Sequence, residues 1–310
     1  MEAMNRRTFI AKTAMATAGV ALEGSASRRS LAADAPMKLS LSVTMAEGKR
    51  TPPAVIEPTM PFDAFLAMAK SCGYQAISMR GSQAGVDTPI EKLREMGRMV
   101  RAQGLQVSRV MPDSAEGINS DYELSTHAIR HITPYLNYAE AFHCNMIRVM
   151  VWKDPDDIVS VQRACDEARE RKIRLVHNSH LGTLFETVNG AIATLKKVNR
   201  PNFGINLEPS LWVGDSHGYG IETIKRISPW LMDVELNNMA DKPGSRGLGL
   251  WEKGAVDSVP VFEGLYAIHY SGWVTAFGGP VDGMTPQETA RKTYEYLKPY
   301  ATHTAKIDKA

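Results

Sequence analysis

The sequence predicts an α/β protein of the (β/α)8 barrel class. From Pro36 onward, short runs typical of β-strands alternate with segments that have helical periodicity, and eight such pairs follow one another. They fill roughly 275 residues, which is near the typical length of a (β/α)8 barrel. A doubly wound open sheet is the competing fold. No Gly-x-Gly-x-x-Gly motif follows the first strand, and this favours the barrel.

The elements are assigned in chain order from their apolar runs and from their turn residues. Strands are expected at 38–44, 74–80, 105–111, 145–152, 173–178, 202–208, 231–237 and 272–278. Helices are expected at 61–73, 88–104, 121–142, 155–172, 183–199, 219–228, 259–269 and 286–300. Pro89 near the first turn and Gly104 just past the last turn are typical boundaries of the second helix. Each strand is expected to be parallel to the next, because a helix must return the chain between them.

The N-terminal segment is predicted to be an export signal rather than part of the barrel. Arg6 and Arg7 precede Thr-Phe-Ile and a mostly apolar run over 14–22, and small residues follow at 32–35. Paired arginines in this setting resemble the twin-arginine signal. The alternative is a chance arginine pair before a short membrane helix, but the run is well below the ~20 residues that a span needs. We expect a signal at 1–35, a barrel domain at 36–310, and export by the twin-arginine machinery to the periplasm or beyond.

Composition excludes several classes of partner. Without residues 1–35 the chain holds equal numbers of basic and acidic residues, so nothing predicts binding to nucleic acid or to an anionic membrane. Three cysteines cannot form a disulfide framework, and no Cys-x-x-Cys motif is present. A homo-oligomer is compatible with the sequence.

Polar residues at the predicted strand ends mark the candidate site, because barrel active sites lie at the C-terminal ends of the strands. Side chains alternate along a strand, so an apolar outer face assigns its neighbours to the inside. This reasoning turns Asn178, Glu208, Glu235 and Asn237 into the barrel. Glu208 and Glu235 lie on adjacent strands, ~4.8 Å apart in backbone spacing.

Two close carboxylates cannot both ionise cheaply. Either a cation lies between them or one of them keeps a proton. A protonated acid beside a charged base suits proton transfer at a sugar carbon or hydroxyl, which makes Glu208 and Glu235 the candidate catalytic pair. The alternative is a structural pair held by Arg174, by lysine or by loop amides.

Four strand-end motifs resemble those of the xylose isomerase-like barrels, the sugar phosphate isomerase/epimerase superfamily. "RLVHNSH", "GINLEPSL", "DVELNN" and "YSGWVTAF" stand where that group usually shows "LxLENH", "GxxLDPGH", "HVHLKD" and "GYxGxxSxE". The resemblance covers most of the chain after residue 35. It implies an enzyme that isomerises, epimerises or eliminates on a carbohydrate.

The resemblance also implies one divalent metal, held by Glu, Asp, His and Glu from strands five to eight. These positions fall on Asn178, Glu208, Glu235 and Phe277, so only Glu208 keeps an acid where one is expected. His180 matches the histidine of the first motif. The remaining oxygen donors, Asn178, Glu208 and Glu235, would suit Mg or Mn, and a site without metal is equally compatible with them.

The other candidate residues are substrate-binding ones. Asn178, His180 and Asn237 are expected to orient sugar hydroxyls. Trp152, Trp212 and Trp251 follow predicted strands and are candidates for stacking on a sugar ring, although packing at the rim would explain them equally.

Two functions are therefore compatible with the sequence. The first is an exported sugar isomerase, epimerase or lyase that uses Glu208 and Glu235. The second is a non-catalytic periplasmic barrel that binds a sugar or a partner and has lost most of the family's metal ligands. The family also includes an endonuclease for abasic DNA, and the neutral charge and the shortage of inward histidines argue against that activity.

Overall fold

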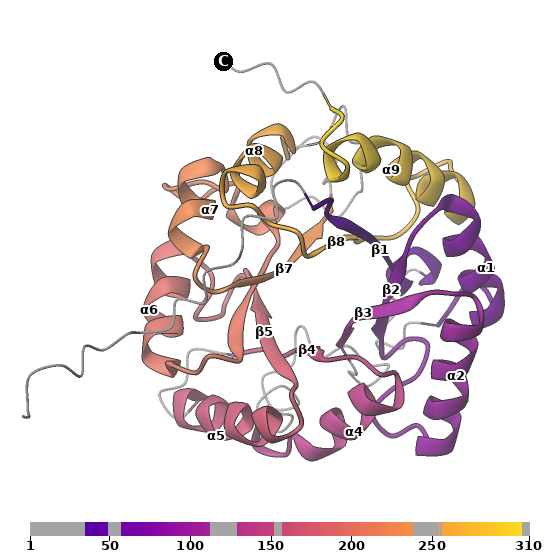
Figure 1. Ribbon diagram of the computed structural model, residues 1–310, viewed down its shortest axis with the longest axis horizontal. Helices are drawn as coiled ribbons and strands as arrows, with labels where there is room; N and C mark the ends of the chain where they lie inside the picture. The colour runs from indigo at the N-terminus through magenta and orange to yellow at the C-terminus, as the bar shows by residue number, and fades with distance from the viewer. Residues whose placement is uncertain are drawn as a thin grey trace, which may run out of the picture. The chain divides into compact units, whose positions relative to one another are not determined.

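Eight parallel strands close into a barrel in the computed structural model, which describes residues 35–48, 57–111, 129–151, 157–237, 254 and 256–305. The strands follow one another around the barrel in chain order, and β1 pairs with β8 to close it (Figure 1). The strands are β1 (Lys38–Ser42), β2 (Ala76–Arg80), β3 (Gln106–Met111), β4 (Met146–Arg148), β5 (Arg174–Asn178), β6 (Phe203–Leu207), β7 (Leu231–Leu236) and β8 (Trp273–Ala276). The predicted (β/α)8 class is confirmed.

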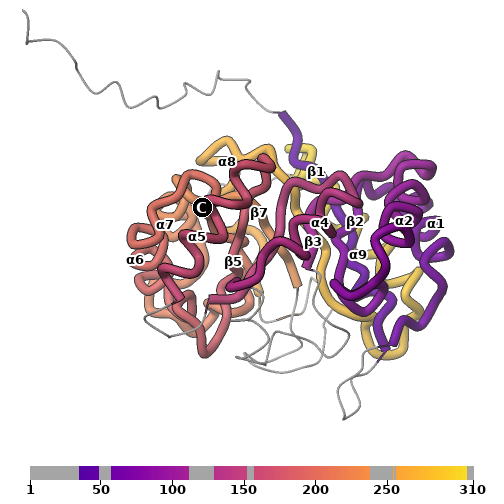
Figure 2. The backbone as a smooth tube through the Cα atoms, turned by 90° about the horizontal axis from the view of Figure 1, so that it is seen from below, coloured from indigo at the N-terminus to yellow at the C-terminus, as the bar shows by residue number. Residues whose placement is uncertain are grey.

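Helices form the layer outside the strands. They are α1 (Phe62–Cys72), α2 (Ile90–Ala102), α4 (Thr133–Ala141), α5 (Asp157–Glu170), α6 (Val188–Val198), α7 (Ile221–Ile227), α8 (Val259–Ala267) and α9 (Pro286–Ala301), with short 3-10 helices η1 (Val43–Ala46) and η3 (Pro209–Trp212). Figure 2 shows α1, α2 and α9 on one side of the barrel and α5, α6 and α7 on the other. In the described part of the chain no helix is long and apolar enough to cross a bilayer.

The ends of several helices follow from local chemistry. Thr285 caps α9, its hydroxyl accepting from the amide of Glu288, while the Glu288 carboxylate accepts from the Thr285 amide. Thr187 caps α6 in the same way by accepting from the amide of Gly190. Helix α1 stops at Gly73, whose φ of 100° lies in the left-handed region that glycine adopts without strain.

One predicted helix differs from the structure. The sequence indicated a single helix over 121–142, whereas α4 begins at Thr133 with Pro134 in its first turn. Proline has no amide hydrogen and favours the first helical turn, so it marks a new start. Residues 112–128 lie outside the described part of the chain, as do residues 1–34, and the export signal stays a prediction.

Two irregularities in strand pairing precede charged residues of the barrel interior. Between β2 and β3 the register moves from Ile77 opposite Val107 to Ser78 opposite Arg109. Between β6 and β7 it moves past Met232 and sets Asn206 opposite Asp233. Each shift inserts one extra residue in β3 or in β7, which changes the cross-strand partner of every residue after it. The bulges therefore help to determine where Arg109 and Asp233 lie.

The two faces of the strands have different compositions. Between the barrel and the helices the side chains are apolar and fully buried, as Phe203, Ile205 and Leu207 are on β6. The interior instead contains buried polar and charged groups. They are Ser40, Arg109, Arg148, Asn178, Asn206, Asp233, Glu235 and Thr275. A barrel interior is usually filled by branched apolar residues, so these groups need partners inside the barrel.

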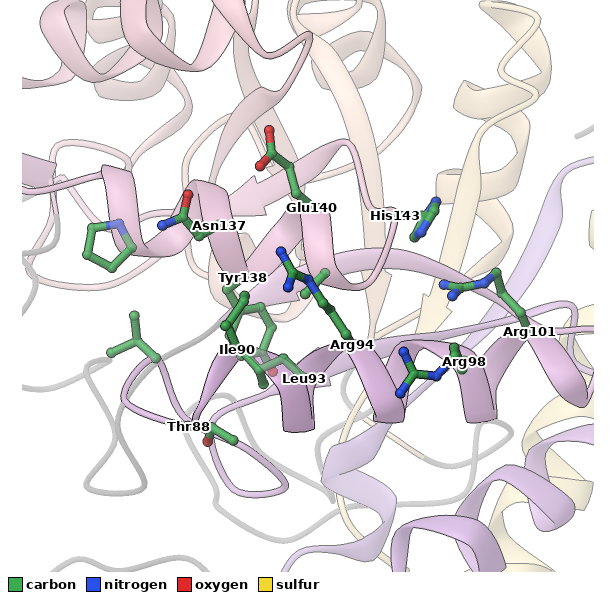
Figure 3. Close-up of a pocket in the computed structure, with 13 residues that line it drawn as sticks. Thr88, Ile90, Leu93, Arg94, Arg98, Arg101, Asn137, Tyr138, Glu140 and His143 are labelled. Atoms are coloured by element: carbon green, nitrogen blue, oxygen red, sulfur yellow. The ribbon is translucent and has the colours of Figure 1, made fainter.

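A separate groove lies in the helical layer between α2 and α4 (Figure 3). Its volume is about 650 Å³, and Arg94, Arg98 and Arg101 of α2 line it together with Asn137 and Glu140 of α4. Among the described residues, those predicted for the site do not line this groove, so the barrel mouth must be considered by itself.

Candidate active site

Glu208 is positioned at the end of β6 by its own backbone contacts. Its amide donates to the hydroxyl oxygen of Ser179, and the same hydroxyl donates to its carbonyl oxygen at 2.8 Å. Ser179 directly follows β5, so two neighbouring strand ends are joined at this point. The side chain of Glu208 is buried, and the residue is only 5% exposed. Sequence reasoning did not identify Ser179.

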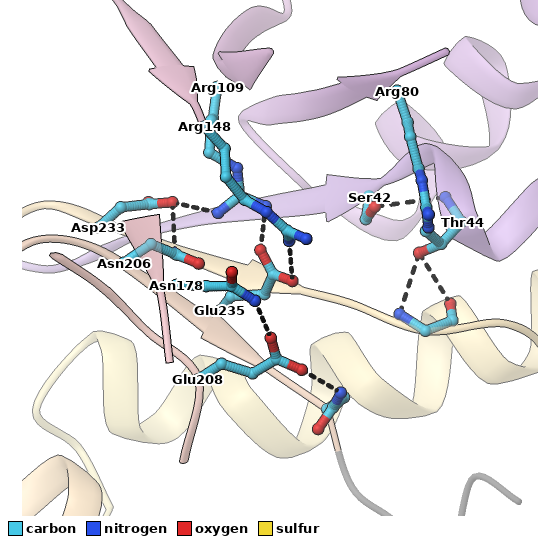
Figure 4. A network of polar contacts seen from close by, with 12 residues as sticks. Ser42, Thr44, Arg80, Arg109, Arg148, Asn178, Asn206, Glu208, Asp233 and Glu235 are labelled. Carbon is cyan, nitrogen blue, oxygen red and sulfur yellow. Dashed lines mark hydrogen bonds and ion pairs between the residues drawn. The ribbon is translucent and has the colours of Figure 1, made fainter. Parts of the chain in front are cut away.

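Both carboxyl oxygens of Glu208 accept hydrogen bonds from amides on the flanking strands (Figure 4). Asn178 at the end of β5 donates Nδ2–H to Oε2, and Asn237 just after β7 donates Nδ2–H to Oε1, each at 2.8 Å. Ser210 adds a longer contact of 3.4 Å to Oε1. The structure thus brings together three residues predicted for the site.

The environment of Glu208 raises the pKa of its carboxyl group to about 7. Burial is the main cause, because it penalises the charged form, and the negative charge of Glu235 acts in the same direction. The positive charge of Arg148 and the hydrogen bond from Asn178 oppose the rise. Glu208 is therefore present in both protonation states near neutral pH.

Glu235 is fully buried and is held by two arginines. Arg148 at the end of β4 donates Nη1–H to Oε1 at 3.2 Å, and Arg109 of β3 donates Nη2–H to Oε2. All three side chains are at most 2% exposed. Two guanidinium groups on one buried carboxylate compensate the cost of removing its charge from water.

Asp233 completes this network. Arg109 donates Nη1–H to its Oδ2 at 2.5 Å, and Asn206 donates Nδ2–H to the same oxygen at 2.8 Å. Burial raises the pKa of Asp233 to about 6, while the charge of Arg109 partly opposes this rise. Arg109 therefore bridges the two acids of β7.

The arginines are the main feature that sequence reasoning missed. Arg109 and Arg148 occur on the successive strands β3 and β4 and reach the acids of β7, whereas Arg80 of β2 lies apart from them (Figure 4). Arg80 pairs instead with Glu47, at 3.5 Å. The available signal was an arginine within each of the apolar runs "LQVSRVM" and "NMIRVMVW". A charge inside such a run must find a partner when the strand is buried.

His180 lies in the loop after β5, near the charged network. Its Nδ1–H donates to the carbonyl oxygen of Leu181 at 2.8 Å, which makes Nε2 the lone-pair nitrogen. Burial lowers the pKa of His180, and the charges of Arg148 and Glu235 also act on it. It is a neutral polar side chain close to the mouth.

His177 points out of the barrel, as the alternation of β5 predicts. It is fully buried and stacks on Phe185, with ring centroids 4.2 Å apart. Burial lowers its pKa to about 3, so it is neutral. It packs between β5 and the turn that precedes α6.

Trp212 differs from the expectation of an exposed aromatic face. Trp212 is completely buried, and its indole N–H donates to the carbonyl oxygen of Phe185 at 3.1 Å. It therefore presents no ring face to solvent. Trp152 and Trp251 lie outside the described residues, and their assignment stays a prediction.

The described residues do not fit the divalent metal that the family resemblance implies. No group of three or more His, Cys, Asp or Glu side chains converges in the described part of the chain. The carboxylate of Glu235 already contacts two guanidinium groups, and the carboxyl oxygens of Glu208 face amide N–H donors. A divalent cation would have to approach these cations and N–H groups, which repel it.

Comparison with known protein families identifies the family of this barrel. Residues 66–300 match the family described as xylose isomerase-like TIM barrel. The chain belongs to that family. The matched residues run from within α1 to within α9, so they include every strand except β1. The family resemblance of the strand-end motifs is thereby confirmed.

Solved structures of similar fold include several sugar epimerases. A D-psicose 3-epimerase superposes with a TM-score of 0.66 at 13% identity and covers 86% of this chain and 100% of its own. A D-allulose 3-epimerase from Methylomonas sp. gives 0.64 at 15%, covering 86% and 98%. The probable 3-DHS dehydratase AsbF from Bacillus anthracis gives 0.65 at 14%, covering 84% and 99%. At these identities the similarity establishes the fold, and no curated protein matches the chain.

Proposed function

We propose that this protein is an exported carbohydrate isomerase, epimerase or lyase whose proton-transfer group is Glu208. The family and the sugar epimerases among the similar folds support the substrate class. The arrangement around Glu208 supports the chemistry. Export rests on the twin-arginine-like segment at 1–35.

The observation that carries this proposal is the set of groups around one titratable carboxyl. The pKa of Glu208 is about 7, so it accepts and returns a proton at neutral pH. Asn178 and Asn237 each keep a buried Oδ1 with no hydrogen-bond partner among the described residues. Buried acceptors of this kind require donors, and the hydroxyl groups of a sugar supply them.

The reaction begins with removal of a proton from the carbon next to a sugar carbonyl group. The C–H bond breaks, the proton moves to the Glu208 carboxylate, and the electron pair is delocalised onto the carbonyl oxygen as an enediolate. Glu208 returns the proton to the neighbouring carbon while the hydroxyl proton of the enediolate moves to the other oxygen, and this isomerises the sugar. Epimerisation instead needs water as a second proton donor on the opposite face of the same carbon, and Glu208 then releases the abstracted proton to solvent. In elimination the β-hydroxyl group instead leaves as water with the proton that Glu208 holds, and the electron pair of the enediolate forms the C=C bond.

Glu235 has a different role from the one that the sequence pattern indicates. Both of its carboxylate oxygens are engaged by arginines, so it is poorly suited to accept a proton during the reaction. We assign it to positioning Arg148, whose positive charge lies close enough to affect the pKa of Glu208. The same positive charge stabilises the enediolate oxygen.

Proton exchange with solvent tests the proposal across many candidate substrates at once. The purified protein is incubated in D2O with a panel of aldoses, ketoses and uronic acids, and deuterium at carbon is followed by NMR. We expect at least one sugar to exchange with the wild type and exchange to fall at least a hundredfold in Glu208→Gln. Arg94→Gln on the exposed surface of α2 is the matched control and should exchange normally. Equal exchange in wild type and Glu208→Gln would refute the assignment.

A sugar-binding protein without catalysis is the second candidate. The departures from the family's metal-binding positions, with Asn178 and Phe277 where acids are expected, favour it. Thermal shifts by sugars, together with no exchange for any member of the panel, would select this function.

A further inference from the structure

Arginine side chains supply the positive charge at the mouth of the barrel. Arg109 and Arg148 reach from β3 and β4 across the barrel to the acids of β7. Arg148 is the last residue of β4, so it lies at the mouth end of the strand, and Figure 4 shows its guanidinium next to the carboxylate of Glu235.

A purely structural ion pair is the competing explanation, since buried pairs often serve only to neutralise each other. Arg109 fits that explanation, because it contacts both Asp233 and Glu235. Arg148 contacts only Glu235 of these two, and its charge also acts on Glu208 and His180 at the mouth. The same cation thus influences three of the candidate residues.

We propose that the guanidinium of Arg148 takes the place of a divalent metal ion in this barrel. It holds a positive charge in contact with Glu235 at the mouth end of the barrel interior, and it excludes a metal ion from the same position. Its use in catalysis, at the developing enediolate oxygen, rests on the proposed function. The exclusion of metal does not, because it follows from the positions of charged groups alone.

The geometry implies that removing this cation would create a metal site. Without Arg148, Oε1 of Glu235 would lose its arginine while Arg109 stays on Oε2, and Asn178 and Asn237 would supply amide oxygens beside Glu208. Carboxylate and amide oxygens are the ligands that Mg and Mn prefer. A lysine at position 148 would keep the positive charge and continue to exclude a metal.

Titration with Mn2+ tests the inference. Free Mn2+ is measured by electron paramagnetic resonance for the wild type, Arg148→Met and Arg148→Lys, with Arg94→Met on α2 as the control. We expect no stoichiometric uptake at micromolar Mn2+ in the wild type, in Arg148→Lys or in the control. Arg148→Met should bind one Mn2+ per chain at least tenfold more tightly than the wild type.

Two results would overturn the inference. One is a stoichiometric Mn2+ site in the wild type, and the other is a folded Arg148→Met that gains no affinity. Circular dichroism establishes folding. Should Arg148→Met fail to fold, Arg148→Gln, which keeps an N–H donor for Glu235, replaces it in the same comparison. The Mn2+ titration contains no sugar, so its result does not depend on the result of the proton-exchange experiment. The two proposals can therefore fail separately.

Discussion

Arg148 and Glu235 form an ion pair inside the barrel, with Nη1 of the arginine 3.2 Å from Oε1 of the glutamate. The two residues lie 87 positions apart in the chain and on strands that do not pair directly. The contact therefore exists only because the barrel closes. It also separates the roles of the two acids, because Glu235 is paired with cations while Glu208 is bonded to amides.

The raised pKa of Glu208 predicts how stability depends on pH. Between about pH 4.5 and pH 7 the folded protein keeps a proton on the Glu208 carboxyl group, whereas the unfolded chain has lost it. The contribution of Glu208 to the free energy of unfolding is therefore lost as pH rises. Glu208→Gln has no titratable group at this position, so its stability lacks this dependence on pH. Its free energy of unfolding should therefore rise relative to the wild type between pH 4.5 and pH 8, by on the order of 3 kcal/mol. Urea unfolding at intervals across this range measures the difference, and parallel curves would contradict the prediction.

His177 predicts the opposite dependence on the acid side. Its pKa is lowered to about 3, so between pH 3 and 6.5 the unfolded chain binds a proton that the folded protein does not. Stability from this residue is complete above 6.5 and is lost as pH falls. His177→Phe, which keeps a ring against Phe185, should lose less stability between pH 7.5 and pH 4.5, by about 2 to 3 kcal/mol. Thermal unfolding at the two pH values compares the variants, and equal losses would count against a buried neutral imidazole.

Removal of Arg109 should lower the free energy of unfolding considerably. Arg109→Met leaves Asp233 and Glu235 buried with one fewer cation, and breaking such a pair typically costs on the order of 3 to 5 kcal/mol. Adding Glu235→Gln to the same variant should restore part of the loss, because one of the stranded charges is gone. Arg94→Met on the exposed face of α2 should change the free energy of unfolding by about 0.5 kcal/mol or less. Denaturant titration ranks the three, and a cost for Arg109→Met no greater than the control would exclude a structural role.

The bulge in β7 leaves room only for glycine at position 204 of β6. A Cβ on Gly204 would lie 2.4 Å from the carbonyl oxygen of Trp230 and 2.6 Å from Cγ of Met232, the extra residue of the bulge. Gly204→Ala should therefore lower the free energy of unfolding by about 1 to 3 kcal/mol, since the backbone carbonyl cannot move aside. Gly214, with nothing within 4 Å of its Cβ position, is the matched control and should tolerate alanine. Equal midpoints of thermal unfolding for both variants would show that the bulge is not packed in this way.

Much of the fold could be predicted because its signals are local. Alternation along β5, β6 and β7 depends only on neighbouring residues, and it correctly turned Asn178, Glu208 and Glu235 into the barrel and His177 out of it. Helix boundaries at Gly73 and Thr285 likewise follow from adjacent residues. The start of α4 was missed although Pro134 was a local signal.

The contact partners of buried polar and charged side chains could not be predicted from neighbouring residues. Trp212 was expected at the surface of the mouth, but the turn after β6 buries it against Phe185. Arg109 and Arg148 are single charges within apolar strand runs, and their partners lie more than 80 residues away along the chain.

The sequence by itself determined the eightfold alternation of strands and helices, the family, and the inward direction of the mouth residues. Only the tertiary structure decided which cations meet which acids, because closure of the barrel and two single-residue bulges bring side chains of β3 and β4 to side chains of β7. The charge that neutralises Glu235, and with it the difference between Glu235 and Glu208, depends on contacts across the barrel that no stretch of neighbouring residues encodes.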